Sequence, residues 1–369
     1  MKLSITKEQM IGGLQVVQNV VSSRSTLPIL SNVLLNAADN KLELTATDLD
    51  VTVSCWVEAV VARPGTVTLP VKRLFGIVRE LGAMDLEMEF DGKGACTLQS
   101  GASYYRLNGM PAEEFPPSQP FTDARVVVIP QEKLRGMLRK TSYAISSDET
   151  RFVLNGIFVS VKETKVTMVA TDGRRLALVD EEVEGLGEGS LEFIVPTKAV
   201  NELTRLLQSA GNVELKLREN LISFNLRGEG GLGIVVITKL VEGNYPNYRQ
   251  VIPTQVRERV GLQREELLQA LKRAEIMTNE KSNSVKLGFT MNNLSITANT
   301  PEVGEARESL AINYKGKDLS IAFNPAYLMD PLRVLEEDEV YLELIDELSP
   351  GVLKVNGPFL YVLMPMRMS

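Results

Sequence analysis

The sequence predicts an α+β protein made of three tandem repeats. Strand hairpins with apolar–polar alternation occur within residues 27–50, 153–179 and 284–304. An amphipathic helix precedes each of these stretches, and a second helix introduced by proline follows each one. Such groups of helices and sequential strands are typical of the α+β class. With 369 residues, the chain is long enough for two or three domains.

The first helix of each repeat is predicted at residues 5–17, 129–141 and 262–274, and we expect each repeat to open with it. The three segments superimpose without gaps, so their apolar residues fall in register. A polar and an acidic residue in each first turn favour a helix start there. The matching apolar positions are Ile5, Met10 and Leu14, then Ile129, Leu134 and Leu138, then Leu262, Leu267 and Leu271.

The hairpin of the second repeat shows the strand pattern most clearly. Apolar and polar residues alternate on both sides of a polar turn at residues 162–165. This period of two is expected for half-buried strands. The chain then passes through an Asp172-Gly173 turn into a third strand, led by Arg174 and Arg175.

The second helix of each repeat is predicted at residues 69–81, 195–207 and 324–336. Pro70, Pro196 and Pro325 lie near the starts of these helices, where proline is favoured. Further strands close each repeat, and the segments at residues 116–125 and 252–258 are predicted linkers. The expected domains are therefore residues 1–124, 125–254 and 255–369. Terminal repeats of such an array expose strand edges, and closure into a ring would cover them.

The composition excludes several kinds of chemistry. The chain contains no histidine, so Ser-His-Asp, Cys-His and HExxH sites are impossible, and an enzyme is disfavoured. No cofactor is expected. Cys55 and Cys96 lie in strand-like segments and are predicted to be buried thiols in a reducing cytoplasm. No signal segment or membrane-spanning run is evident, so a cytoplasmic protein is expected.

Four short motifs each have an ordinary structural interpretation. Residues 228–233 match GxGxxG, but a strand-like segment follows, so a hairpin turn is favoured over a dinucleotide site. Asp48 and Asp50 could hold Mg²⁺, although carboxylates in a turn are commoner and no metal site is expected. The acidic residues 336–339 are predicted to form a solvated turn. The methionine-rich segment 361–368 is interpreted as a core strand with a frayed tail, with a docking surface as the alternative.

The second helix of repeat one and both helices of repeat two carry nine bases and three acids, although the net charge of the chain is −7. This segregation favours a basic surface that faces a polyanion over ordinary helix surfaces. No base-reading motif is present, so nucleic-acid contact would be to phosphates and independent of sequence. The nine bases are Lys72, Arg73, Arg79, Lys133, Arg135, Arg139, Lys140, Lys198 and Arg205.

The repeat pattern and several segments together resemble the bacterial replicative sliding clamp, the β subunit of DNA polymerase III. The segments are residues 24–32, 154–177, 242–253, 276–281 and 361–368. The resemblance covers essentially the whole chain. It implies three repeats of the DNA-clamp fold and a head-to-tail homodimer that forms a six-domain ring, with helices lining the hole and sheets outside. It further implies that the polymerase III catalytic subunit, the clamp loader and other replication and repair proteins dock through a Leu/Phe linear motif.

The resemblance also implies functional residues. The docking cleft between repeats two and three would comprise Leu154, Thr171, Gly173, Arg174, Arg175, Leu176, Pro246, Val251, Leu348, Val362, Met364, Pro365 and Met366. The positions facing duplex DNA would be Arg24, Lys72, Arg79, Lys198 and Arg205. The dimer contact would join Tyr105 and Leu107 of one subunit to Ile276 and Met277 of the other.

Some positions depart from the family's common pattern. Arg174 stands where histidine is frequent, Gln250 where arginine is frequent, and Thr197 where a basic residue is often found. Phe152 and Val153 stand where tyrosines can meet single-stranded DNA. In addition, Pro350 replaces a small hydroxyl residue beside the cleft.

Three function classes compete. The first is a non-enzymatic ring that confers processivity, and the second is a peptide-binding scaffold of the clamp fold that does not encircle DNA. The third is an enzyme that uses the turn at residues 171–175 as an anion site. The third is the weakest, because Asp172 has no evident partner for acid–base or nucleophilic chemistry.

Overall fold

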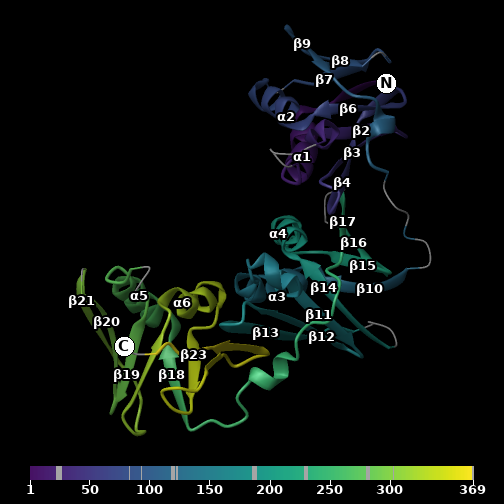
Figure 1. The fold of residues 1–369 in the computed structure, drawn as a ribbon. Coiled ribbons are helices and arrows are strands. Elements are labelled where there is room, and N and C mark those ends of the chain that lie inside the picture. Colours follow the sequence, from purple (N-terminus) through teal and green to yellow (C-terminus); the bar gives the residue numbers. More distant parts are fainter. Residues whose placement is uncertain are drawn as a thin grey trace. The chain divides into compact units, whose positions relative to one another are not determined.

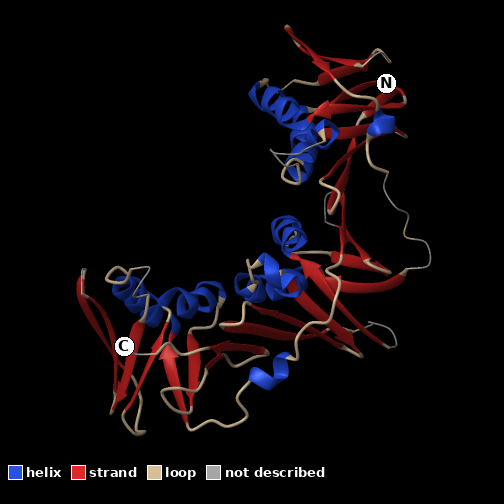
Figure 2. Ribbon diagram, viewed as in Figure 1, coloured by secondary structure: helices blue, strands red, loops and turns tan. Residues whose placement is uncertain are grey.

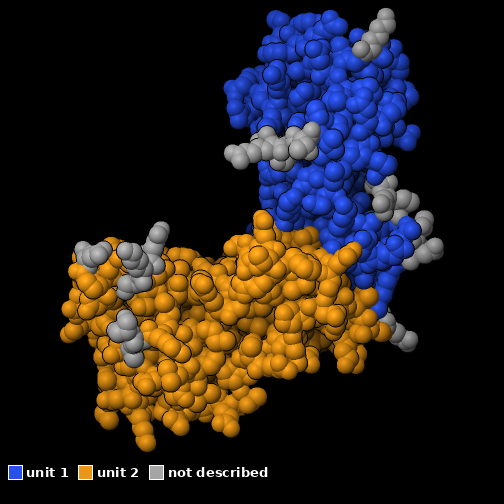
Figure 3. All heavy atoms as spheres, viewed as in Figure 1, with its two compact units in different colours: residues 1–135, 185–187, 198–240 blue, residues 136–184, 188–197, 241–369 orange. Residues whose placement is uncertain are grey.

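The structure is a computed structural model that describes residues 1–21, 27–82, 84–92, 94–117, 121, 124–184, 189–227, 232–279, 283–301 and 303–367. It divides into two compact units, coloured blue and orange in Figure 3. Unit 1 comprises residues 1–135, 185–187 and 198–240, and unit 2 comprises residues 136–184, 188–197 and 241–369. Each unit contains two antiparallel sheets with helices packed on them.

Unit 1 holds a five-stranded and an eight-stranded sheet (Figure 1). The first has the order β5-β1-β7-β8-β9 and the second the order β10-β15-β16-β17-β4-β3-β2-β6. The five-stranded sheet comprises β1 (Lys2–Ile5), β5 (Val60–Arg63), β7 (Leu86–Phe90), β8 (Ala95–Ser100) and β9 (Ser103–Asn108). The eight-stranded sheet comprises β2 (Asn32–Ala38), β3 (Lys41–Thr47), β4 (Val51–Glu58), β6 (Gly65–Pro70), β10 (Arg125–Pro130), β15 (Asn212–Arg218), β16 (Leu221–Arg227) and β17 (Gly233–Lys239).

Three helices belong wholly or mainly to unit 1: α1 (Lys7–Val17), α2 (Val71–Glu80) and α4 (Thr197–Leu206). Thr6 caps α1, because its hydroxyl accepts a hydrogen bond from the Gln9 amide at 3.2 Å. Met10 and Leu14 form part of the buried face of this helix. Gly13 lets the helix approach the sheet closely, since a Cβ there would lie 2.8 Å from Leu44 Cδ1.

Unit 2 repeats this plan with an eight-stranded sheet, β14-β11-β12-β13-β25-β24-β23-β18, and a four-stranded sheet, β21-β20-β19-β22. The eight strands are β11 (Gly156–Lys162), β12 (Lys165–Thr171), β13 (Arg175–Glu182), β14 (Ser190–Pro196), β18 (Glu258–Gln263), β23 (Glu339–Leu344), β24 (Gly351–Lys354) and β25 (Phe359–Leu363). The four strands are β19 (Val285–Thr290), β20 (Asn293–Thr300), β21 (Gly304–Ala311) and β22 (Leu319–Phe323).

Helices α5 (Arg264–Glu275) and α6 (Pro325–Val334) lie side by side against the strands of unit 2 (Figure 2). Helix α3 (Gln131–Thr141) contributes its C-terminal half to this unit. Short 3₁₀ turns occur at Pro28–Ser31, Ala112–Glu114, Ser142–Ala144, Glu149–Leu154 and Tyr248–Val251. The six predicted helices and the predicted hairpin strands are thus confirmed to within a few residues at their ends.

The expectation that each repeat opens with a helix is wrong. A strand comes first in every repeat: β1 precedes α1, β10 precedes α3, and β18 precedes α5. Each opening strand pairs with a strand that closes its own repeat, namely β7, β15 or β23. These strands have only four to six residues, so their alternation is too short to stand out beside the helix that follows.

The sheets do not follow the repeat boundaries. Strand β17 of the second repeat pairs with β4 of the first, with Val236 opposite Val53. Strand β25 of the third repeat pairs with β13 of the second, with Tyr361 opposite Ala177. Each eight-stranded sheet therefore contains strands from both sides of a predicted domain limit, and those limits remain predictions.

Two of the smaller predictions agree with the structure. Strands β16 and β17 form a hairpin in which Arg227 lies opposite Gly233, so a strand and not a helix follows the glycine-rich segment. The turn at residues 228–231 itself lies outside the described residues. Cys55 and Cys96 are buried free thiols. Burial raises the pKa of Cys55 to about 12 and that of Cys96 to about 11.

Candidate functional site: a strand junction in unit 2

The predicted cleft residues surround the turn between β12 and β13. Asp172 holds this turn, since its Oδ1 accepts hydrogen bonds from the amides of Arg174 at 2.8 Å and Arg175 at 3.1 Å. The Thr171 hydroxyl donates to the Arg175 carbonyl at 2.6 Å. Gly173 has a φ of +86°, a left-handed conformation that glycine adopts without strain. The Asp-Gly turn predicted from the sequence is confirmed.

Arg175 points inward and joins two repeats. Its guanidinium forms ion pairs with Asp172 of the turn, at 3.1 Å, and with Asp330 of α6. It also donates to the Tyr143 carbonyl at 2.5 Å and lies over the Tyr327 ring, with its Cζ 4.2 Å from the ring centroid. Burial opposes the charged form of Arg175, but the charge interaction with Tyr361 and the hydrogen bond to Asp330 together raise the Arg175 pKa above its usual value. This side chain is therefore a structural tie at the site.

A buried apolar cluster underlies the turn. Leu176 and Val362 are each only 2% exposed, and they pack with Phe158, Val169 and Ile194. Partly buried side chains of the segment at residues 241–252 pack against this cluster, and one of them, the Tyr245 ring, stacks on Phe158 at 5.1 Å between centroids. Leu176 and Val362 therefore form the floor of the site.

The accessible apolar surface comes from other predicted residues. Met364 is 38% exposed, and its amide donates to the Arg174 carbonyl at 3.0 Å, which fixes the segment after β25 beside the turn. The amide of Met366 donates to Ala322 at 2.7 Å. Val251 and Leu348 are also exposed. Leu154 is buried, and Pro246 is exposed and follows the stacked Tyr245.

A polar cavity of about 380 Å³ borders the turn. Arg151, Arg174 and Asp148 line it. The Asp148 Oδ2 accepts a hydrogen bond from Arg151 Nε at 2.9 Å. The hydrogen bonds from Thr150 and Arg151 lower the pKa of the Asp148 carboxyl. An apolar surface and a polar, arginine-containing cavity thus meet at the 171–175 turn.

The structure places the thirteen predicted cleft residues in one unit and unites most of them around β13 and β25. Leu348 lies on the loop between β23 and β24, just before Gly351, which pairs with Leu363 of β25. Sequence reasoning missed Phe158, Tyr245 and Ile252 beneath the site and Tyr327 and Asp330 beside Arg175. The aromatic–proline step at residues 245–246 could have indicated Tyr245. Nothing in the local sequence indicated Asp330.

Most of the predicted DNA-facing bases already have partners. Lys198 Nζ lies 2.8 Å from Asp48 and 3.5 Å from Asp50. The hydrogen bond to Asp48 is the main reason that the pKa of Lys198 is raised. The carboxylates considered for Mg²⁺ are therefore paired with a lysine, which supports the ordinary interpretation of that turn. Lys72 is exposed without an ion pair in the described part of the chain, whereas Arg24 lies outside it.

The predicted dimer-contact residues lie on or beside edge strands of two sheets, the five-stranded sheet of unit 1 and the four-stranded sheet of unit 2. Tyr105 and Leu107 are on β9, the last strand of the five-stranded sheet. Ile276 follows α5 and is 73% exposed. Met277 packs beneath β21, since a Cβ on Gly304 would lie 2.8 Å from Met277 Cε. Both sets of residues therefore lie at sheet edges.

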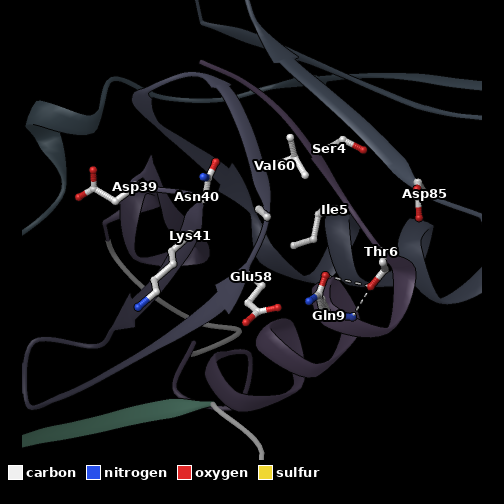
Figure 4. Close-up of a pocket in the computed structure, with 11 residues that line it drawn as sticks. Ser4, Ile5, Thr6, Gln9, Asp39, Asn40, Lys41, Glu58, Val60 and Asp85 are labelled. Carbon is white, nitrogen blue, oxygen red and sulfur yellow. Dashed lines mark hydrogen bonds between the residues drawn. The ribbon is translucent and has the colours of Figure 1, made fainter.

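A second cavity, of about 550 Å³, lies in unit 1 between the start of α1 and the ends of β3 and β4 (Figure 4). Its wall carries the carboxylates of Asp39, Glu58 and Asp85. Within the described ranges, no group of three or more His, Cys, Asp and Glu side chains could hold a metal ion. Likewise, none of the described helices is long and apolar enough to cross a membrane.

Three α+β repeats, whose sheets continue from one repeat into the next, define a protein of the DNA-clamp class. Models of the DNA polymerase III beta subunit match the chain throughout: the N-terminal domain at residues 1–119, the central domain at 128–247 and the C-terminal domain at 249–367. The chain belongs to the DNA polymerase III beta-subunit family, the beta sliding clamps.

Individual relatives agree over the full length. The beta sliding clamp of Chlamydia muridarum is 36% identical over 368 residues, covering 100% of this chain and 99% of the relative. That of Escherichia coli K12 is 34% identical over 373 residues, with 100% of both chains covered. A DnaN sliding clamp from Bartonella birtlesii, solved bound to griselimycin, has a TM-score of 0.94 and 35% identity, with 100% of both chains covered.

Proposed function

We propose that this protein closes around duplex DNA as a head-to-tail homodimer and tethers DNA polymerase III and other partners to it. It would act in the cytoplasm as a non-catalytic processivity factor. The observation that carries the proposal is the way strands pair at the repeat junctions. At both junctions inside the chain, the last strand of one repeat pairs with the third hairpin strand of the repeat before it.

One such junction is left open within a single chain. Strand β9 is the last strand of the first repeat, and β21 is the third hairpin strand of the last repeat. Among the described strands, each has a neighbour on one side only. Pairing β9 of one copy with β21 of a second would complete the pattern, and two such contacts would close a dimer.

The internal junctions also predict a register for this contact. Val236 and Tyr361 lie opposite Val53 and Ala177, and the equivalent positions at the open edges are Tyr105 and Ala306. Antiparallel pairing from there sets Arg106 opposite Glu305 and Leu107 opposite Gly304. Leu107 would then lie over Met277, as the dimer-contact prediction requires.

The site around the 171–175 turn would receive the partners. Met364, Met366 and Val251 provide exposed apolar surface beside a buried floor, and apolar surface with a few convergent polar groups is what a ligand groove needs. Burying each leucine or phenylalanine anchor of a linear motif contributes roughly 1.5–3 kcal/mol. After the cost of ordering the peptide, about 6–8 kcal/mol remains, a micromolar-range affinity that lets partners exchange on one ring.

Comparison of circular and linear DNA tests encirclement. Protein loaded on closed circular DNA should remain bound at a salt concentration that abolishes direct binding, because release requires the ring to open. Cutting the circle should release it. Equal loss from cut and closed circles would instead favour a clamp-fold scaffold that does not encircle DNA. That alternative draws support from the pairing of Lys198 and Arg205 with acidic residues.

A further inference from the structure

The C-terminal ends of two helices meet at the first repeat junction. Arg205, in the last turn of α4, reaches the end of α1. Its Nη1 donates to the Gln15 carbonyl at 3.0 Å and its Nη2 to the Val16 carbonyl at 2.6 Å. The last carbonyls of a helix lack partners within the helix and carry partial negative charge, so a guanidinium satisfies both requirements. Arg205 therefore ties the second helix of repeat two to the first helix of repeat one.

The corresponding helix ends of the second junction, those of α3 and α6, also contact each other, but there a basic residue pairs with an acidic side chain and not with helix carbonyls. Arg139 and Lys140 end α3, and they lie 3.6 Å from Glu336 and 3.8 Å from Glu337, which follow α6. The Glu336 side chain is 84% exposed, as the prediction of a solvated acidic turn requires, and the two glutamates also form ion pairs across the repeat junction. At both junctions, the first helix of one repeat ends against the second helix of the next.

One pair of helix ends has no counterpart within the chain: the end of α2 and the end of α5. Arg79 follows Pro70 by nine residues, as Arg205 follows Pro196 by nine, so the two arginines hold equivalent positions. Arg79 is 62% exposed, and within the described residues its one ion pair is with its neighbour Glu80, at 2.9 Å. In α5, Lys272 follows Leu262 by ten residues, as Gln15 follows Ile5 by ten. The carbonyls of Lys272 and Arg273 are thus equivalent to those that Arg205 binds.

We propose that Arg79 is an intersubunit latch. In the dimer, its guanidinium binds the carbonyls of Lys272 and Arg273 at the end of α5 in the second copy, and Glu80 pairs there with the exposed Lys272 side chain. The proposal rests on the head-to-tail assembly proposed above. It transfers Arg79 from the predicted DNA-facing set to the dimer contact, and it adds a polar contact to the strand pairing of β9 with β21.

The dissociation constant of the dimer tests the latch. It can be measured by analytical ultracentrifugation of the full chain carrying Arg79→Ala. Losing the equivalent of one hydrogen bond of ordinary strength should weaken each contact about 5- to 10-fold. Because a closed dimer contains the contact twice, the constant should rise about 25- to 100-fold. Arg63→Ala is the matched control, since Arg63 is similarly exposed and ion-paired, with Glu89 at 3.2 Å, and should change the constant less than twofold.

A charge exchange tests the second half of the latch. Lys272→Glu should weaken the dimer, because it places a carboxylate against Glu80, and adding Glu80→Lys should restore the constant to within about threefold. DNA binding is measured at concentrations where each variant is dimeric. The salt dependence for Arg79→Ala should match that of the parent, whereas a lost phosphate contact would reduce the slope by about 0.9.

Two results would overturn the latch while leaving the assembly intact. One is a dimeric parent whose constant stays within twofold on Arg79→Ala, and the other is a charge exchange that restores nothing. A parent that is monomeric at micromolar concentration would instead refute the proposed assembly, and the latch with it. The reduced salt slope would return Arg79 to the DNA-facing set.

Discussion

Arg175 and Arg174 are adjacent in the sequence but have different roles in the structure. Arg174 is exposed at the wall of the polar cavity, and Arg175 forms ion pairs with Asp172 and Asp330. The sequence supports a turn led by two arginines because Asp172 and Gly173 are local signals. It cannot assign the inward direction of Arg175, because Asp330 lies 155 residues away in the chain.

At the residue scale, we expect Arg175→Met to destabilise unit 2. Removing one partner from a mostly buried ion pair costs about 3–5 kcal/mol, and we expect the lower end of that range because Arg333 stays 3.1 Å from Asp330. Hydrogen exchange of β13 and α6 measures the change, and Arg174→Met serves as the exposed control with an expected effect below about 0.5 kcal/mol. Similar protection in the two variants would show that Arg175 is not the tie between these elements.

At the scale of elements, strand alternation predicts the hairpins well, whereas the partners of the strands are set by tertiary packing. The pairing of β17 with β4 joins residues from different repeats, and nothing local in either strand specifies it. Short opening strands such as β1 were missed for a different reason. They pair with strands of their own repeat, but they are too short to show a period. Strands β9 and β21 correspond to the strands that pair at the internal junctions, but within one chain they have no such partner among the described strands.

The edge strand β9 has one face for assembly and one for solvent. Tyr105 and Leu107 lie on the same face of the sheet as the buried side chains of Leu98 and Met88. Tyr104 lies on the other face. Tyr105 is 37% exposed, so Tyr105→Asp should convert the dimer of 40.7 kDa subunits into monomers at micromolar concentration without burying a charge. Tyr104→Asp, the same charge on the opposite face, should leave it dimeric. Sedimentation velocity distinguishes them, and monomers from both variants would argue against the proposed register.

At the scale of the whole molecule, the two proposed activities are separable. The site around the 171–175 turn is built from unit 2 alone, whereas the dimer contact joins β9 of unit 1 to β21 of another copy. The family and its repeat number could be read from the sequence, because the repeats share motifs at constant spacing. Which cleft residues are floor and which are surface could not, because Leu176 and Met364 differ only in how the surrounding chain covers them.

A monomeric variant should therefore still bind partners. We expect the Tyr105→Asp chain to bind a fluorescent peptide with the Leu/Phe motif within twofold of the parent affinity, at one peptide per chain, by fluorescence anisotropy. Met364→Asp should weaken binding at least tenfold without affecting dimerisation. It is a better probe than Leu176→Asp, which would bury a charge in the core. Loss of binding in the monomer would mean that the second copy completes the site.

The continuity of the sheets bears on how the protein can be divided. A fragment that stops at residue 124 would remove β17, and the edge of β4 that β17 covers would become available to other molecules. Strand edges uncovered in this way can pair with other chains and promote self-association. A fragment of residues 1–240 retains that pairing but loses β25, so it uncovers the equivalent edge of β13. The segment duplicated in the sequence is thus not the smallest piece that can be cut out, exchanged or grafted intact.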